Sequence, residues 1–266
     1  MFIHLHCHSY YSFLRGASAP EALLEQAARL GLKQLALTDR AGLYGAVAFA
    51  RRAEAMGIRP IVGAELPLEG AGGVVALPRS AAGYAALCRA LTRLHLDPAF
   101  EPWAALETLA EDNWLLFAEP HGLTEALRRF RSPHLVAELV DHGRPADRAR
   151  NRALAELARR HEMPAAATNA VGFAAPGDWE THRLLTAIRL RSTLGKLGPA
   201  DTAAPDAWLK APAQMAARFR ELPEALAATE RIAESCEFRF TSGATLHPPF
   251  PLPAGESAFS LLWKRA

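Results

Sequence analysis

Short apolar segments alternate with longer amphipathic segments along most of the chain. The short segments predict seven strands, at residues 2–8, 34–39, 59–65, 73–78, 113–118, 134–140 and 164–170. Between several of them apolar residues recur at helical spacing, which predicts helices at residues 20–31, 46–57, 81–95, 145–161 and 179–190. Apolar strands that alternate with helices are typical of a parallel sheet covered by helices. The pattern predicts an α/β fold, and we expect a closed barrel of βα units rather than an open sheet.

The pattern changes after about residue 195. Residues 198–212 are rich in Pro and Ala and predict a connection, and two helical patterns follow at residues 214–222 and 223–236. The last twenty residues carry four prolines and then the start of another helix. We therefore expect two parts, a barrel domain at residues 1–195 and a connector with a mostly helical segment at residues 196–266.

The amino-acid composition limits where in the cell the protein is expected and which partners it is expected to bind. The formal net charge of the 266 residues is +2, so net charge gives no argument for nucleic-acid binding. The three cysteines, Cys7, Cys88 and Cys236, lie far apart, which predicts reduced thiols rather than a disulfide framework. The N-terminus lacks the pattern of a signal peptide, and no apolar run approaches the roughly 18 residues that a membrane helix needs. We expect a cytoplasmic protein with no membrane partner.

Histidines alternate with apolar residues in the first predicted strand, which reads FIHLHCH. Because successive side chains of a strand point to opposite sides, His4, His6 and His8 are expected to share one face and Cys7 to lie on the other. His6 and His8 would then be about 6.6 Å apart along the strand, close enough to bind one metal ion or a close pair of ions. Histidines and carboxylates are common ligands of zinc, manganese and iron.

Asp39 and Glu65 end the second and third predicted strands, as His8 ends the first. In barrels of βα units the active site is built at the C-terminal ends of the strands. The pattern therefore predicts a metal-type site, working or ancestral, that contains His6, His8, Asp39 and Glu65. In the alternative interpretation the histidines are hydrogen-bonded core residues, Asp39 caps the following turn, and Glu65 is simply exposed.

Four segments carry a resemblance to a known family: HLHCHSYYSFLRGAS, LALTDRAGLYGAVAFA, GIRPIVGAE and PAAATNAVGF. They are similar to successive motifs of the PHP (polymerase and histidinol phosphatase) domain, and more narrowly to the N-terminus of bacterial C-family DNA polymerase III alpha subunits. FLRGAS and TDRAGLYGAV resemble the error-prone branch of that family. The resemblance implies a distorted (β/α)7 TIM-like barrel with up to three metal ions that serve phosphoester hydrolysis. It also implies a parent nucleotidyltransferase that acts on DNA in replication and repair, with the polymerase core as a partner of this domain.

Compared with the family motifs, the metal site is incomplete. His6, His8 and Glu65 match family ligands, and Asp39 matches the aspartate of a TDH motif. Other ligand positions of the family carry residues that supply no ligand here: Arg15, Arg40, Ala170 and Gly172. Arginine at two of these positions places permanent positive charge where a cation would bind.

Two interpretations of this incomplete site stay open. In one, the four matching residues hold a single, weakly bound zinc or manganese ion. In the other, which we favour, no metal is bound, and the arginines pair with Glu65 or Asp39 so that ion pairs hold the strand ends together. The expected function is then mainly structural, as the PHP domain of an error-prone-type polymerase. The alternative function is that of a free-standing metal-dependent phosphoesterase or 3′–5′ exonuclease, and the sequence assigns no catalytic residue to either.

Several other side chains are candidates for a role near the same face. Aromatic residues there could stack on bases, although aromatics that follow a strand more often fill the core: Tyr10, Tyr11, Phe13 and Tyr44. His95 and His121 are expected at the surface. Glu138 and His142 lie on and just after the sixth predicted strand, where we expect them to pair.

Overall fold

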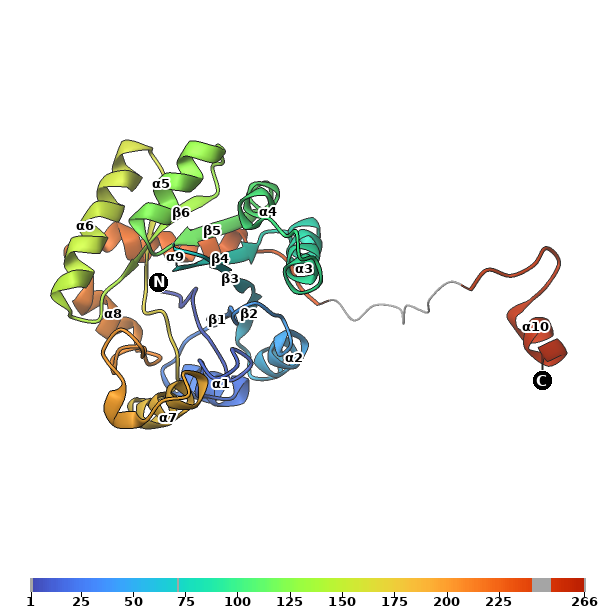
Figure 1. The fold of residues 1–266 in the computed structure, drawn as a ribbon, viewed down its shortest axis with the longest axis horizontal. Coiled ribbons are helices and arrows are strands. Elements are labelled where there is room, and N and C mark those ends of the chain that lie inside the picture. The colour runs from blue at the N-terminus through green and yellow to red at the C-terminus, as the bar shows by residue number, and fades with distance from the viewer. Residues whose placement is uncertain (1, 71, 241–249, 266) are drawn as a thin grey trace.

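The computed structural model describes residues 2–70, 72–240 and 250–265. Helices surround a central group of strands (Figure 1). The strands are β1 (Gln34–Leu37), β2 (Arg59–Val62), β3 (Ala64–Leu68), β4 (Gly72–Pro78), β5 (Asn113–Phe117), β6 (Leu135–Val140) and β7 (Ala165–Thr168). They form a two-stranded sheet of β1 and β2 and a five-stranded sheet in the order β3-β4-β5-β6-β7.

The helices agree well with the sequence pattern. They are α1 (Pro20–Arg29), α2 (Ala46–Ala55), α3 (Ala81–Leu96), α4 (Pro102–Leu109), α5 (Pro120–Arg129), α6 (Pro145–Arg160), α7 (Trp179–Arg189), α8 (Pro212–Arg218), α9 (Pro223–Ser235) and α10 (Ala258–Arg265). All the helices expected from apolar spacing form, with ends that differ by a few residues. The pattern does not predict α4 and α5; α5 buries only Gly122, Leu123 and Ala126, so a single large apolar side chain marks its inner face.

The expectation of a wholly parallel sheet is wrong for part of the barrel. β1 pairs with β2 in parallel, as do β5 with β6 and β6 with β7. β4, however, runs antiparallel to both β3 and β5. Only three residues separate β3 from β4, and a parallel pair needs a crossover of a dozen residues or more, so these neighbours must be antiparallel.

The third predicted strand, at residues 59–65, is in fact two strands that belong to different sheets. The break falls at Gly63, whose N–H donates to the carbonyl oxygen of Leu37 at 2.9 Å. A side chain at residue 63 would clash with the carbonyl oxygen of Ala76 in β4. Glycine therefore lets the chain leave the β1–β2 sheet and press against the neighbouring sheet within a single residue.

One apolar cluster shows that the two sheets enclose a single interior. This interior cluster takes buried side chains from the N-terminal segment, from six strands of both sheets and from α9: Ile3, Leu5, Ala36, Ile61, Val75, Leu77, Leu116, Val136, Ala166, Ala228, Ile232, Ala233 and Cys236. Because α9 contributes three of these residues and Cys236 directly follows it, the helix closes one end of the barrel. The fold is a distorted, TIM-like α/β barrel with one end plugged by an apolar helix.

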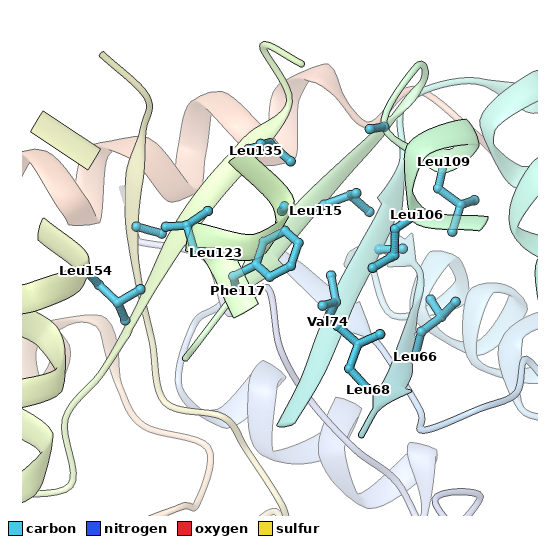
Figure 2. Packing of buried hydrophobic residues seen from close by; sticks show 14 of the residues in the cluster. Leu66, Leu68, Val74, Leu106, Leu109, Leu115, Phe117, Leu123, Leu135 and Leu154 are labelled. Atoms are coloured by element: carbon cyan, nitrogen blue, oxygen red, sulfur yellow. The ribbon is translucent and has the colours of Figure 1, made fainter. Parts of the chain in front are cut away.

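A second apolar cluster fills the space between the larger sheet and the helices outside it. Figure 2 shows part of this cluster, with side chains of β3 to β6 beside those of α4, α5 and α6. Phe117 of β5 and Leu123 of α5 are both fully buried in it. Burial of such large apolar side chains supplies most of the free energy that holds the helices on the sheet.

Helices α8 and α9 pack against the barrel. Met215 and Phe219 join the cluster of the larger sheet, and the N–H of Ile3 donates to Thr229 Oγ1 in α9 at 3.1 Å. Helix α10 has no buried residue. The division after residue 195 stays a prediction, and residues 241–249 of the predicted connector lie outside the described residues. None of the helices in the described part of the chain has the length and apolar character to cross a membrane.

Candidate metal centre

A bulge in the N-terminal segment decides where its histidines point. The N–H of Ala36 donates to the oxygen of His4, whereas the N–H of Thr38 donates to the oxygen of Cys7. The two donors are two residues apart, whereas the two acceptors in the N-terminal segment are three residues apart. The N-terminal segment therefore contains one extra residue, which is a β-bulge. The predicted strand at residues 2–8 is consequently an extended segment, joined to the rest of the barrel by a bridge between Cys7 and Val171.

The expectation that three histidines share one face is wrong because of this bulge. Before it, Leu5 faces the barrel interior and His4 points outward, where its Nε2 lies 2.9 Å from the carbonyl oxygen of Lys210. After it the alternation is reversed, so that Cys7 packs in an outer apolar cluster. His6 and His8 thereby reach the open end of the barrel, opposite α9, which we call the mouth.

At the mouth His6, His8 and Glu65 form a compact triangle. Nε2 of His6 and Nε2 of His8 are 3.2 Å apart, and Nε2 of His8 is 3.2 Å from Oε2 of Glu65. One ligand atom from each of the three residues lies within 4.8 Å of the others. Glu65 comes from the second position of β3, just after the end of β2, rather than from the end of the predicted third strand.

Glu138 supports the triangle from inside the barrel. Its Oε1 accepts hydrogen bonds from Nδ1 of His6 at 2.7 Å and from Oγ1 of Thr168 at 2.5 Å. Because a carboxylate only accepts, Nδ1 of His6 carries the proton of this hydrogen bond, and Nε2 is the atom left for a ligand. Burial lowers the pKa of His6, but the charges of Glu138 and Glu65 outweigh it and leave the pKa raised.

The role of Glu138 was missed by the sequence reasoning. The expected pair between Glu138 and His142 is wrong, because His142 Nε2 lies instead 2.9 Å from the carbonyl oxygen of Asn169. A usable signal existed in the sequence LVAELV, where all six residues of β6 are buried and only one is charged. A carboxylate on a strand buried on both faces needs a polar partner, since an unpaired buried charge is strongly unfavourable.

Arg40 pairs with the carboxylate of Glu65. The Nη1 atom of Arg40 bonds to Oε1 of Glu65, and the backbones of the two residues form a parallel bridge. Burial raises the pKa of Glu65, but the hydrogen bond from His8 and the charges of His8, His6 and Arg40 lower it to about 2. The ion pair expected between an arginine at a lost ligand position and Glu65 is therefore confirmed.

Asp39 does not join the triangle, because its carboxylate is already bound by a nearby loop. Oδ1 accepts from the N–H of Ser9 at 2.7 Å and from Oγ of Ser12 at 2.6 Å, while Oδ2 accepts from Oγ of Ser9 at 2.7 Å. Three hydrogen bonds satisfy a buried carboxylate without any cation. Asp39 thus ties the loop after the N-terminal segment to the end of β1.

The remaining replaced positions bring no ligand to the mouth. The guanidinium of Arg15 is exposed and forms no ion pair with any part of the chain that the structure describes. Ala170 adopts a left-handed backbone conformation with φ of 39°, and the N–H of Gly172 donates to the oxygen of Ala207 at 2.9 Å. His95 and His121 are exposed, as expected.

The donor atoms of the triangle fit one divalent ion. Zinc–nitrogen bonds of 2.0–2.1 Å in a tetrahedral site place neighbouring ligand atoms about 3.3 Å apart, and two of the ligand-atom separations here are 3.2 Å. Three ligands of this kind leave a fourth position open. Within residues 2–70, 72–240 and 250–265 there is no second group of three or more His, Cys, Asp or Glu residues with such spacing.

Comparisons with known proteins identify a family and relatives for this chain. The family model of the PHP domain matches residues 4–161. The chain is 36% identical to an error-prone DNA polymerase of Mycobacterium bovis over 97% of this chain and 27% of the relative. It is 35% identical to an error-prone DNA polymerase of Symbiobacterium thermophilum over 96% of this chain and 27% of the relative. The chain thus spans about a quarter of the length of these curated relatives.

Two solved structures resemble this chain at low sequence identity. An amidohydrolase from Chromobacterium violaceum, described with bound SO4 and no metal, aligns with a TM-score of 0.49 at 15% identity, covering 65% of this chain and 88% of that one. A two-domain protein containing a PHP-like metal-dependent phosphoesterase, from Bacteroides vulgatus, aligns with a TM-score of 0.45 at 13% identity, covering 69% of this chain and 55% of that one. The family model matches more than half of the chain, and the chain therefore belongs to the PHP domain family.

Proposed function

We propose that this chain is the N-terminal PHP domain of an error-prone-type DNA polymerase and that its mouth is held together by ion pairs and hydrogen bonds instead of metals. The observation that carries the proposal is the bond between Arg40 and Glu65. Glu65 is the only carboxylate of the ligand triangle, and one of its two oxygens is already bonded to a fixed positive charge. A guanidinium at this place repels a divalent cation and cannot be neutralised by losing its proton.

The other buried carboxylates of the mouth support the same proposal. Glu138 is satisfied by His6 and Thr168, and Asp39 is satisfied by Ser9 and Ser12. A metal site in a protein usually concentrates negative charge that only the ion relieves. Here the carboxylates have partners within the chain, so their burial is stable without an ion.

The alternative to a metal-free mouth is a residual metal site, which the spacing of ligand atoms in the triangle favours. One divalent ion would be held by Nε2 of His6, Nε2 of His8 and an oxygen of Glu65, with Glu138 orienting His6. When bound, such an ion supplies Lewis-acid activation for phosphoester hydrolysis. Binding it requires His6 to be neutral and the ion to compete with Arg40 for Glu65, and both requirements weaken the affinity.

The wider role follows from the relatives rather than from the site. Proteins named error-prone DNA polymerase match almost the whole of this chain. We infer a role for residues 1–195 as a scaffold beside the polymerase core, with residues 196–266 as the connection to it. On this proposal the protein acts in the cytoplasm, and DNA is the substrate of the parent chain.

The test is metal analysis of the purified protein combined with hydrolysis of a generic phosphodiester in the presence of manganese. We expect well under one zinc or manganese ion per chain and no turnover above the blank. Stoichiometric metal together with turnover that is lost in His8→Ala and Glu65→Ala would overturn the proposal. His121→Ala is the matched control, because His121 is exposed and lies outside the triangle.

A further inference from the structure

Aromatic side chains stand exposed beside the mouth. Tyr10 is 45% exposed, Tyr44 is 68% exposed and Phe13 is 80% exposed. The interpretation that aromatics following a strand fill the core is wrong for these three residues. Exposed rings gathered in one place are uncommon, because each leaves a large apolar surface in water.

Two glycines in the loop before α2 leave room for tyrosine rings against the backbone. A side chain at residue 42 would clash with the ring of Tyr44, and one at residue 45 would lie 2.6 Å from Cδ2 of Tyr11. The rings of Tyr10 and Tyr11 also contact each other, with centroids 4.7 Å apart. Contacts of this kind hold exposed rings in fixed orientations, which reduces the entropy lost when a ligand binds to them.

The two segments that carry these rings are joined side by side. The N–H of Arg40 donates to Oγ of Ser12 at 2.9 Å, and the ring of Tyr11 rests on Gly45. Phe13 directly follows Ser12 in the chain, and Tyr44 directly precedes Gly45. The rings therefore belong to one surface, which we call the aromatic rim and define as Tyr10, Phe13, Arg15 and Tyr44.

Arginines give this surface a positive character. Arg15 is exposed and has no ion-pair partner among the residues that the structure covers. Partial burial and the charges of Arg40 and Arg189 lower the pKa of Arg15, while the charge of Glu65 acts in the opposite direction. Arginine keeps its charge under these conditions and presents a planar fork that matches a phosphate group.

We propose that the aromatic rim binds single-stranded nucleic acid without cleaving it, with bases stacked on Phe13 and Tyr44 and a phosphate bound by Arg15. Flat exposed rings next to cations are the combination by which proteins bind unpaired strands without sequence preference. Apolar rings alone would also suit a partner protein. The phosphate backbone of a nucleic acid is favoured because Arg15, an exposed cation, belongs to the same surface. This inference rests on the proposed function, because a bound strand stays intact only if the mouth holds no metal that hydrolyses its phosphodiester bonds.

The test compares two labelled oligonucleotides by fluorescence anisotropy, a single-stranded oligo-dT and an abasic strand of equal length. The 266-residue chain is used in EDTA, so that neither binding nor cleavage depends on a metal. We expect the oligo-dT to bind at least about tenfold more tightly, because only it offers bases to stack. Since one base–aromatic stack contributes about 1–3 kcal/mol, Phe13→Ala and Tyr44→Ala should each weaken binding about 5- to 150-fold.

Two further variants sharpen the test. Arg15→Ala should reduce the slope of log affinity against log salt by about 0.7, the contribution of one phosphate contact on a single strand. Phe259→Ala is the matched control, because Phe259 is 74% exposed but lies on α10, and binding should not change. Equal affinity for both strands, no binding of either, or unchanged binding in folded Phe13→Ala and Tyr44→Ala would overturn the inference. None of these outcomes depends on metal content or turnover, which test the proposed function separately.

Discussion

The two ends of the barrel are built on different principles. At the plugged end Ile232 and Ala233 of α9 share one buried apolar cluster with Ile3 and Leu5, and no member of this cluster is charged. At the mouth the buried side chains are charged or polar and are matched pair by pair, as Glu138 is with His6. The plugged end therefore depends on filled volume, whereas the mouth depends on the correct partner for each charge.

This difference predicts the largest loss of stability at the plugged end. Ile232→Ala removes three methyl or methylene groups from a fully packed site and should lower the free energy of unfolding by about 2–5 kcal/mol. Ile188→Ala is the same substitution on a side chain that is 54% exposed, and it should change that free energy by less than about 0.5 kcal/mol. Urea denaturation measures both. Equal effects of the two substitutions would show that α9 does not plug the interior.

The mouth should instead lose stability in acid. The pKa of Glu65 lies near 2 in the folded protein, below its ordinary value of 4.5, so its stabilising effect is complete above pH 4.5 and is lost as pH falls toward 2. This lowering of the Glu65 pKa corresponds to a contribution on the order of 3 kcal/mol to the free energy of unfolding at neutral pH. Denaturation curves measured in EDTA between pH 7 and pH 3 should show this loss in the unmodified chain.

Two variants separate this loss from general acid unfolding. Glu65→Gln cannot titrate, so the unfolding free energy of this variant should fall less steeply between pH 4.5 and pH 3. Ile232→Ala should keep the slope of the unmodified chain, because the plugged end carries no titrating pair of this kind. Identical slopes for Glu65→Gln and the unmodified chain would contradict the assigned role of Glu65.

The smallest expected effect concerns the balance between arginine and metal at the mouth. Arg40→His removes the fixed charge from Glu65 and restores the ligand type implied by the family motif. The affinity for manganese, measured by isothermal titration calorimetry, should rise about 10- to 100-fold, the usual size of effects from groups that support metal ligands. Arg51→His, at an exposed position of α2, should leave the affinity unchanged. A similar rise in both variants would point to nonspecific binding by the added histidine.

Much of the fold could be predicted from the sequence, because short stretches of residues determine where helices and strands form. Most of the helices form where apolar residues recur at helical spacing, and the pairing of Arg40 with Glu65 follows from their opposite charges at neighbouring positions of the family motifs. The antiparallel position of β4 was predictable only from a connection too short for a crossover. The spacing of apolar residues therefore predicted the positions of helices and strands more reliably than whether neighbouring strands run parallel or antiparallel.

The details of the site depend on contacts that no local pattern encodes. The bulge that separates His4 from His6 is visible only through the hydrogen bonds to β1. Glu138 reaches His6 across 132 positions of the chain. Asp39 looked like a metal ligand because its position matches the family motif, but the serines of the loop at residues 9–12 already fill its hydrogen-bonding capacity.

The central claim is that ion pairs and not metals hold the mouth together, and thermal unfolding with and without a chelator tests it most directly. The account predicts that the melting temperature in EDTA agrees within about 1 °C with that in 100 μM manganese or zinc, because little metal binding is linked to folding. An ion bound with a dissociation constant near 1 μM would add about 2.7 kcal/mol at that concentration, which raises the melting temperature by more than about 5 °C. A drop of that size on chelation, reversed by added metal, would contradict the account.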